Sequence, residues 1–145
     1  MRVLLQKVAS AKVTVADELI GEINQGFLLY VGFTHEDTLQ KAQALAEKIS
    51  KLRVFADEND KLNLNIFQAE GSILSVSQFT LYGSTKKGNR PSFTDAMLPA
   101  DAEKLYQGFN GHLRKLGLRV ATGSFGAHMA VSSVNDGPVT FWLEN

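Results

Sequence analysis

The sequence has no cysteine among its 145 residues, and its three histidines, at positions 35, 112 and 128, are scattered. The absence of cysteine excludes a disulfide framework, a thiolate metal site and a cysteine nucleophile. No histidine lies three or four positions from another, the spacing at which one helix face holds a metal ion. We therefore expect neither a bound metal nor a cofactor.

The sequence also lacks an excess of charge of either sign. Lys plus Arg and Asp plus Glu both number 15, which gives a formal net charge of zero. This balance argues against a protein that coats nucleic acid by bulk charge, although a local patch can still bind a few phosphates.

Long apolar runs are missing as well. No segment approaches the ~20 apolar residues of a membrane span. The opening stretch MRVLLQKVASAKVTV lacks the apolar core of a signal peptide. We expect a soluble cytoplasmic protein with no membrane partner.

The composition that remains fits one globular domain covering residues 1–145. Hydrophobic residues make up 44% of the chain and charged residues 21%, close to ordinary globular usage. A domain of this length buries roughly 70% of the surface that its unfolded chain exposes.

Short strand-like runs alternate with two helical segments. Residues 34–52 have apolar positions at helical spacing, and Thr34 with Asp37 fits the start of that helix. A second helix opens at Pro99 and stops near Gly117. Strands are expected at residues 3–15 (irregular near Ala9), 18–23, 27–33, 53–55, 73–82, 118–122, 128–134 and 139–143. This order predicts an α+β fold with antiparallel or mixed pairing.

A polar loop at residues 83–90, GSTKKGNR, has two glycines at the spacing of a P-loop. The Lys-Ser/Thr pair that a P-loop needs after its second glycine is absent, which excludes that kind of nucleotide site. The loop does gather Lys86, Lys87 and Arg90. Two interpretations are equally favoured: a binding site for one or two phosphates, or a solvated loop.

Hydroxyl side chains gather on the run at residues 73–82. Ser77 and Thr80 lie three positions apart, so on a regular strand they point to opposite faces. A serine or threonine nucleophile needs a base within hydrogen-bond reach, and no such residue is near in sequence. From the residues alone, a core strand with small hydroxyls is favoured over a catalytic site.

Two stretches change this interpretation when they are taken together. SQFTLY at residues 77–82 and NDGPVT at residues 135–140 resemble the two signature motifs of the D-aminoacyl-tRNA deacylase family. The likeness covers the whole chain and includes LLQKVASAKVTV near its start, KLNLNI at 61–66, RPSF at 90–93 and TGSFGAHM at 122–129. The resemblance implies a curved, barrel-like mixed or antiparallel sheet with two main helices, assembled as a homodimer.

The resemblance also implies an activity and a site. The family hydrolyses the ester between a D-amino acid and the 3′ end of tRNA, and also acts on glycyl-tRNA. Gly137 and Pro138 would form a cis peptide that enters the active site of the other subunit, with its carbonyls facing the substrate's α-amino group. Phe125 and Met129 match positions that hold the terminal adenosine. The catalytic segment would consist of Ser77, Gln78, Phe79 and Thr80.

Elementary chemistry agrees with these roles of the Gly137–Pro138 backbone and of the Ser77–Thr80 segment. A Gly-Pro bond adopts the cis form at a cost of about 0.5–1 kcal/mol, and proline leaves rigid backbone groups to present. A backbone wall is indifferent to side-chain identity but rejects an L side chain by a clash. Backbone N–H groups near Phe79 and Thr80 are suited to an ester oxyanion. We expect Thr80 to position the substrate while water attacks, with the 2′-hydroxyl of the RNA assisting.

One departure from the family pattern concerns the Gly-Pro loop. The family commonly has arginine after the first-strand glutamine, whereas this chain has Lys7. Lysine cannot make the same two-pronged contact. The sequence therefore does not predict how the loop is held.

Two rival functions remain open. One is a hydrolase of the same fold with another specificity, such as an editing module that removes an L-amino acid. The other is a non-catalytic tRNA-binding module, which zero net charge disfavours.

Overall fold

The computed structural model describes all residues 1–145. Its helices are α1 (Leu39–Lys51) and α2 (Pro99–Lys115), with a short 3₁₀ helix η1 (Phe79–Tyr82). Its strands are β1 (Arg2–Val15), β2 (Glu18–Ile23), β3 (Gly26–Gly32), β4 (Phe55–Ala56), β5 (Leu62–Leu64), β6 (Ser72–Ser77), β7 (Val120–Thr122) and β8 (Ala130–Glu144).

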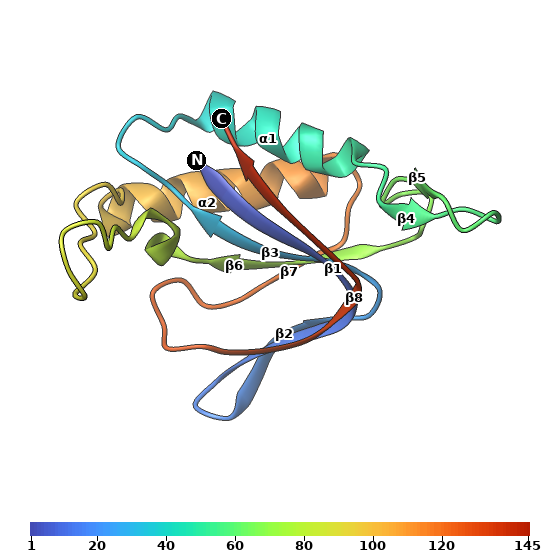
Figure 1. The fold of residues 1–145 in the computed structure, drawn as a ribbon, viewed down its shortest axis with the longest axis horizontal. Coiled ribbons are helices and arrows are strands. Elements are labelled where there is room, and N and C mark those ends of the chain that lie inside the picture. Colours follow the sequence, from blue (N-terminus) through green and yellow to red (C-terminus); the bar gives the residue numbers. More distant parts are fainter.

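One sheet carries the fold, in the order β2-β1-β3-β6-β7, and β8 pairs with β1. The pairs β3–β6 and β6–β7 are parallel, while β1 runs antiparallel to β2, β3 and β8. Both helices cover one face of the sheet, and β2 curls away beneath the other (Figure 1). The expected α+β fold with a mixed sheet and two main helices is confirmed.

The sheet curls until β2 approaches β7. A Cβ atom added to Gly21 of β2 would lie only 2.8 Å from the carbonyl oxygen of Thr122 in β7, so glycine permits this close approach. No ladder joins the two strands, and the sheet is therefore barrel-like but open along this seam.

Two apolar cores hold the layers together, and β3 contributes to both. Phe27, Leu29 and Val31 pack with helix residues such as Phe109, whereas Leu28 faces the smaller core inside the curl of the sheet. A strand buried on both faces has a continuous apolar run, as the sequence of residues 27–33 predicts.

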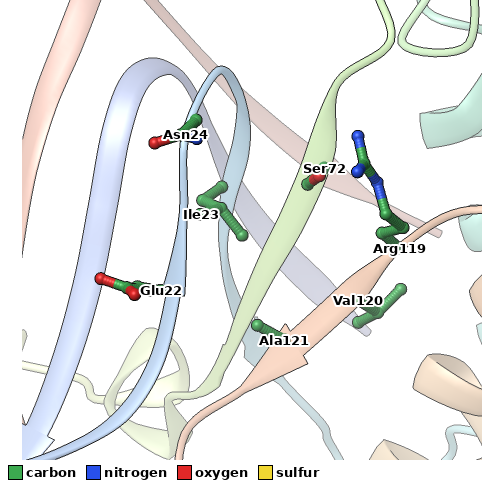
Figure 2. A pocket seen from close by; sticks show the side chains of 7 residues that line it. All are labelled: Glu22, Ile23, Asn24, Ser72, Arg119, Val120 and Ala121. Atoms are coloured by element: carbon green, nitrogen blue, oxygen red, sulfur yellow. The ribbon is translucent and has the colours of Figure 1, made fainter.

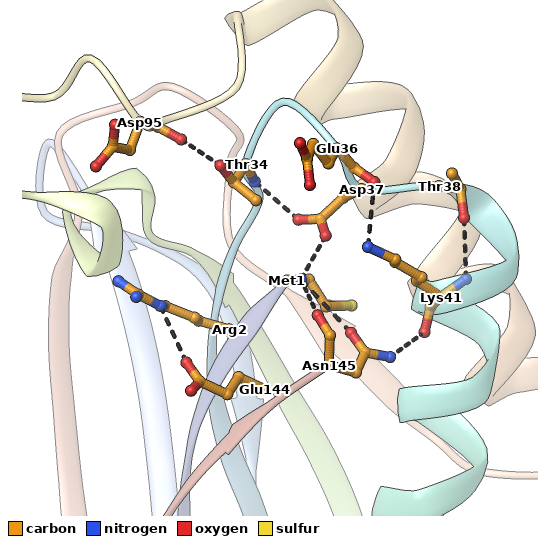
Figure 3. Close-up of polar contacts among 10 residues, drawn as sticks. All are labelled: Met1, Arg2, Thr34, Glu36, Asp37, Thr38, Lys41, Asp95, Glu144 and Asn145. Atoms are coloured by element: carbon orange, nitrogen blue, oxygen red, sulfur yellow. Dashed lines mark hydrogen bonds and ion pairs between the residues drawn. The ribbon is translucent and has the colours of Figure 1, made fainter.

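Helix α1 begins later than expected. Thr38 is its N-cap and accepts a hydrogen bond from the Lys41 N–H, so the prediction of a start at Thr34 is wrong. Asp37 lies instead 2.5 Å from the ammonium of Met1 and accepts the Thr34 N–H (Figure 3). The residues before the helix form a turn, which the Asp37 N–H closes by donating to the Thr34 carbonyl at 3.1 Å.

Several strand boundaries also differ from the expectation. The run at residues 73–82 is a strand only to Ser77, after which the chain turns into η1. The two strands expected at 128–134 and 139–143 form one strand, β8, because β1 pairs with both halves of it. The strand expected at 53–55 is found further along, as β4 at Phe55–Ala56, and the run at 118–122 shortens to β7. Helix α2 opens at Pro99 as expected, and Gly117 follows it with φ +96°, a left-handed conformation that favours glycine.

Candidate functional site

The segment from Ser77 to Thr80 lies where β6 ends. The Gln78 N–H donates to the Val31 carbonyl at 2.7 Å as the last bond of the β3–β6 ladder, and the Leu81 N–H then donates to the Gln78 carbonyl at 3.3 Å as the chain turns into η1. The following 3₁₀ turn places Thr80 beyond the strand, so the alternation that would put Ser77 and Thr80 on opposite faces no longer applies. The structure thus brings all four expected catalytic residues to one strand end.

Backbone N–H groups at this strand end are free. As the first residues of η1, Phe79 and Thr80 have no acceptor within the helix. No turn, loop or side-chain hydrogen bond uses their N–H groups either. Such paired donors suit an oxyanion that forms during acyl transfer.

The side chain of Thr80 has no base beside it. Its hydroxyl accepts a hydrogen bond from the Gln78 amide at 2.5 Å, and no histidine or carboxylate hydrogen-bonds to Ser77 or Thr80. The chemistry available here is therefore that of backbone dipoles and a positioned hydroxyl, not of an activated side-chain nucleophile.

Phe125 and Met129 lie on the connection from β7 to β8, at the same edge of the sheet. The Gly123 N–H donates to the Ser75 carbonyl in β6, which fixes this connection beside the strand that ends at Ser77. The Phe125 ring packs at 5.9 Å from that of Tyr106, and the Met129 sulfur lies over Gly123.

Tyr106 of helix α2 supports this edge from beneath. Its hydroxyl donates to the Ser75 carbonyl at 2.7 Å, so Ser75 accepts from both α2 and the β7–β8 connection. Burial raises the pKa of the Tyr106 phenol above its ordinary value, and the hydroxyl therefore stays protonated as a donor.

Gly137 and Pro138 lie in a loop within β8. Gln6 pairs with Thr140 and Val8 with Asn135, so residues 136–139 bulge out opposite Lys7 alone. The Gly137–Pro138 peptide is cis, as expected, and Gly137 has φ +122°. Both residues are exposed, so their backbone groups face outward from this chain.

Two side chains that the sequence interpretation missed hold this loop. Asp136 pairs with the Lys7 ammonium at 2.9 Å. Asn135 donates from its side-chain amide to the Lys7 carbonyl at 2.8 Å and the Val139 carbonyl at 3.1 Å, closing the base of the loop. Lys7 thus holds the loop through a single ion pair.

The two motifs lie apart within one chain. The Gly137–Pro138 loop lies opposite Lys7. Lys7 pairs with Phe27 in β3, and Phe27 pairs with Ile73 in β6. The loop is therefore level with the start of β6, whereas Ser77 lies at its end. Three strand spacings and four residues of rise separate it from Ser77, which amounts to roughly 15–20 Å. Figure 1 shows the bend of β8 and η1 on opposite sides of the molecule.

Two cavities of the single chain lie away from both motifs. The larger, about 520 Å³, opens on the seam between β2 and β7 and is lined by Glu22, Ile23, Asn24, Ser72, Arg119, Val120 and Ala121 (Figure 2). It lies at the start of β6, away from Ser77. A smaller cavity of about 240 Å³ runs between α2 and Phe125. No helix is long and apolar enough to cross a membrane.

Comparison with known proteins points to one family. The family model described as D-Tyr-tRNA(Tyr) deacylase matches residues 4–144. A D-aminoacyl-tRNA deacylase of an Exiguobacterium species is 59% identical over 144 residues, covering 99% of this chain and 98% of the relative. One from Bacillus cytotoxicus is 55% identical over 145 residues, covering 100% and 99%.

Solved structures share the fold. A protein described as a c-Myc DNA unwinding element binding protein superimposes with a TM-score of 0.93 at 41% identity, covering 100% of this chain and 99% of that one. A probable eukaryotic D-amino acid tRNA deacylase gives a TM-score of 0.87 at 18% identity, covering 98% and 97%, a likeness of fold alone.

Proposed function

Because the chain belongs to the D-Tyr-tRNA(Tyr) deacylase family, we propose that it hydrolyses D-aminoacyl-tRNA to a free D-amino acid and tRNA. It is accordingly a carboxylic ester hydrolase. The family match over residues 4–144 carries this conclusion. We place the enzyme in the cytoplasm, where charged tRNA is used, and include glycyl-tRNA among its substrates.

The catalytic step follows from the free backbone donors at the end of β6. Water adds to the ester carbonyl, and the N–H groups of Phe79 and Thr80 stabilise the oxyanion. The ester bond to the 3′-oxygen of the tRNA then breaks, and this oxygen takes up a proton. The Thr80 hydroxyl, hydrogen-bonded to Gln78, positions the substrate, and the 2′-hydroxyl of the terminal ribose assists. Phe125 and Met129 hold the terminal adenosine.

Chirality is tested by the backbone of Gly137 and Pro138. Their carbonyls face the α-amino group of the substrate, an L side chain strikes the wall, and a D side chain or the hydrogen of glycine does not. The exposure of both residues in the free chain supports this role.

The active site is completed by a second copy of the chain. The Gly137–Pro138 loop and the Ser77–Thr80 segment lie too far apart in one chain to share a substrate. A homodimer in which each loop enters the partner's site brings the two segments together. Exposed Phe79 on η1 and exposed Phe141 and Trp142 on β8 supply apolar surface for such an assembly.

The test is turnover of D-tyrosyl-tRNA, L-tyrosyl-tRNA and L-seryl-tRNA at substoichiometric protein. We expect many turnovers of the D-ester and little hydrolysis of either L-ester. Preferential hydrolysis of L-seryl-tRNA would favour the editing hydrolase of the same fold. Binding without turnover would favour the non-catalytic tRNA-binding module.

A further inference from the structure

One charged segment near the candidate site has no role in the chemistry described so far. Ser84 and Ser92 exchange two backbone hydrogen bonds, of 2.8 and 2.9 Å, and close a loop over residues 85–91. We call these residues the basic loop. Its three cations, Lys86, Lys87 and Arg90, are all exposed.

These cations have no partner within the chain. None of them forms an ion pair or a side-chain hydrogen bond, whereas Lys7, Lys51 and Lys104 pair with carboxylates. Each of the other four arginines, at positions 2, 53, 114 and 119, donates to a backbone carbonyl. Arg90 is thus the one arginine whose guanidinium is entirely free.

The surrounding sequence contains no opposite charge. From Gly71 to Thr94 there is no aspartate or glutamate, and this stretch includes the whole Ser77–Thr80 segment. A chain with zero net charge therefore presents a local positive region at one place, beside its candidate active site.

The basic loop is fixed to the catalytic segment at both of its ends. The Phe93 ring packs edge-on against that of Phe79 at 5.0 Å, and it lies so close over Gly83 that a Cβ there would meet it at 2.9 Å. Beyond Phe93, the His35 ring contacts the Thr94 carbonyl at 2.8 Å and the Thr34 hydroxyl donates to the Asp95 carbonyl at 2.6 Å. The loop therefore projects from a rigid base and not from a floppy connection.

We propose that the basic loop binds backbone phosphates of the tRNA acceptor end as the ester enters the site. Arg90 offers a planar fork that matches two phosphate oxygens, and Lys86 and Lys87 add point charges. Such contacts position an RNA without reading its bases, which suits an enzyme that acts on many tRNAs. The proposal rests on the proposed function, since it names how that function's substrate is held.

The experiment compares two triple variants of equal charge change. The first is Lys86→Gln, Lys87→Gln and Arg90→Gln. The control is Lys48→Gln, Lys61→Gln and Lys115→Gln, which removes three exposed cations from α1, the β4–β5 turn and the end of α2. Deacylation of D-tyrosyl-tRNA is followed at ~50 to 300 mM salt. For the first variant we expect KM to rise about tenfold with kcat unchanged, and the slope of log(kcat/KM) against log[salt] to flatten by roughly two.

Two further measurements separate the outcomes. A D-tyrosyl ester of adenosine has no phosphate, so the basic-loop variant should hydrolyse it at the wild-type rate; an equal loss on this ester would overturn the proposal. So would an equal rise in KM for the control variant, or equally tight, loop-dependent binding of duplex DNA. Filter binding of uncharged tRNA tests the loop even if no ester is hydrolysed, so failure of the loop and failure of the proposed function are distinguishable.

Discussion

The ammonium of Lys7 lies 2.9 Å from the Asp136 carboxylate, across the gap between two strands of the same sheet. The Lys7 side chain is almost fully buried and passes 6.0 Å from the centre of the Phe55 ring, whereas Asp136 is half-exposed at the surface. The buried stem fixes the position of the charge, and the charge fixes the loop that carries Gly137 and Pro138. A residue of the first strand thereby sets the geometry of a loop near the other end of the chain.

Replacing Lys7 with methionine should loosen this loop without emptying the core. The ion pair is partly exposed, so we expect a cost of about 1 kcal/mol, seen as a roughly fivefold lower kcat/KM for D-tyrosyl-tRNA. Lys7→Arg should retain activity. Lys12→Met, at an exposed lysine of the same strand, is the control. Unchanged activity in Lys7→Met would show that the Asp136 pair does not hold the loop.

Asn135→Ala should destabilise the protein more than a typical surface change. The substitution removes the side-chain amide that donates to the carbonyl of Lys7, in strand β1, and to the carbonyl of Val139. We expect the free energy of unfolding in urea to fall by about 1–2 kcal/mol. Ser133→Ala, two residues earlier on the same strand and exposed, should fall within about 0.5 kcal/mol of wild type. Equal effects of the two would contradict this role.

Local sequence patterns predicted the elements whose own apolar residues face the core. The apolar run at residues 27–33 predicted a buried strand, and the spacing after Pro99 predicted α2. The patterns failed where a distant group decides the outcome. The Asp37 carboxylate pairs with the ammonium of Met1, 36 positions away. The Asn135 amide donates to the carbonyl of Lys7, 128 positions away. Composition alone shows NDGP as a turn but not what holds that turn.

The sequence likewise predicted only part of the candidate site. Resemblance named Ser77 to Thr80 together, but alternation on a regular strand separates Ser77 from Thr80. The 3₁₀ turn after Gln78 resolves this, because the strand ends at Ser77 and η1 begins at Phe79. The proposed contact of the Gly137–Pro138 loop with that segment requires a second chain, which no local pattern of one sequence specifies.

Thr80→Ala should leave substantial deacylation. The alanine keeps the backbone N–H that we assign to the oxyanion and loses only the hydroxyl that contacts Gln78. We expect kcat to fall by less than about tenfold, since no base is present to make Thr80 a nucleophile. Rapid quench and mass spectrometry of the wild type should find no acyl-enzyme. Abolished activity together with a trapped acyl-threonine would refute the assignment.

Tyr82 should make stability fall at high pH. Burial, reinforced by the negative charge of Asp37, raises the pKa of this phenol to about 12. Between pH ~10, where the unfolded phenol ionises, and pH ~12, the folded state holds a proton that the unfolded state has lost, so the free energy of unfolding decreases as pH rises. We expect a loss of about 1 kcal/mol after allowing for solvent screening, measured by urea unfolding at pH 9 and 11. Tyr82→Phe keeps the ring beneath Arg2 and should remove this part of the pH dependence; a variant with the wild-type decline would assign it elsewhere.

Asp37→Asn should be the most destabilising of these single changes. Its carboxylate and the Met1 ammonium are both fully buried, at 1% and 0% exposure, and the ammonium also contacts the Asn145 carbonyl at 3.2 Å (Figure 3). Asparagine keeps the shape but leaves a buried ammonium without its counter-charge, which costs about 3 kcal/mol or more. Asp101→Asn removes an exposed pair with Lys104 and should cost less than about 1 kcal/mol. Chemical denaturation of both variants at pH 7 measures the difference. If the two midpoints shift alike, the ion pair at Met1 contributes no more than a surface contact, and the turn before α1 is held by the hydrogen bonds between Thr34 and Asp37.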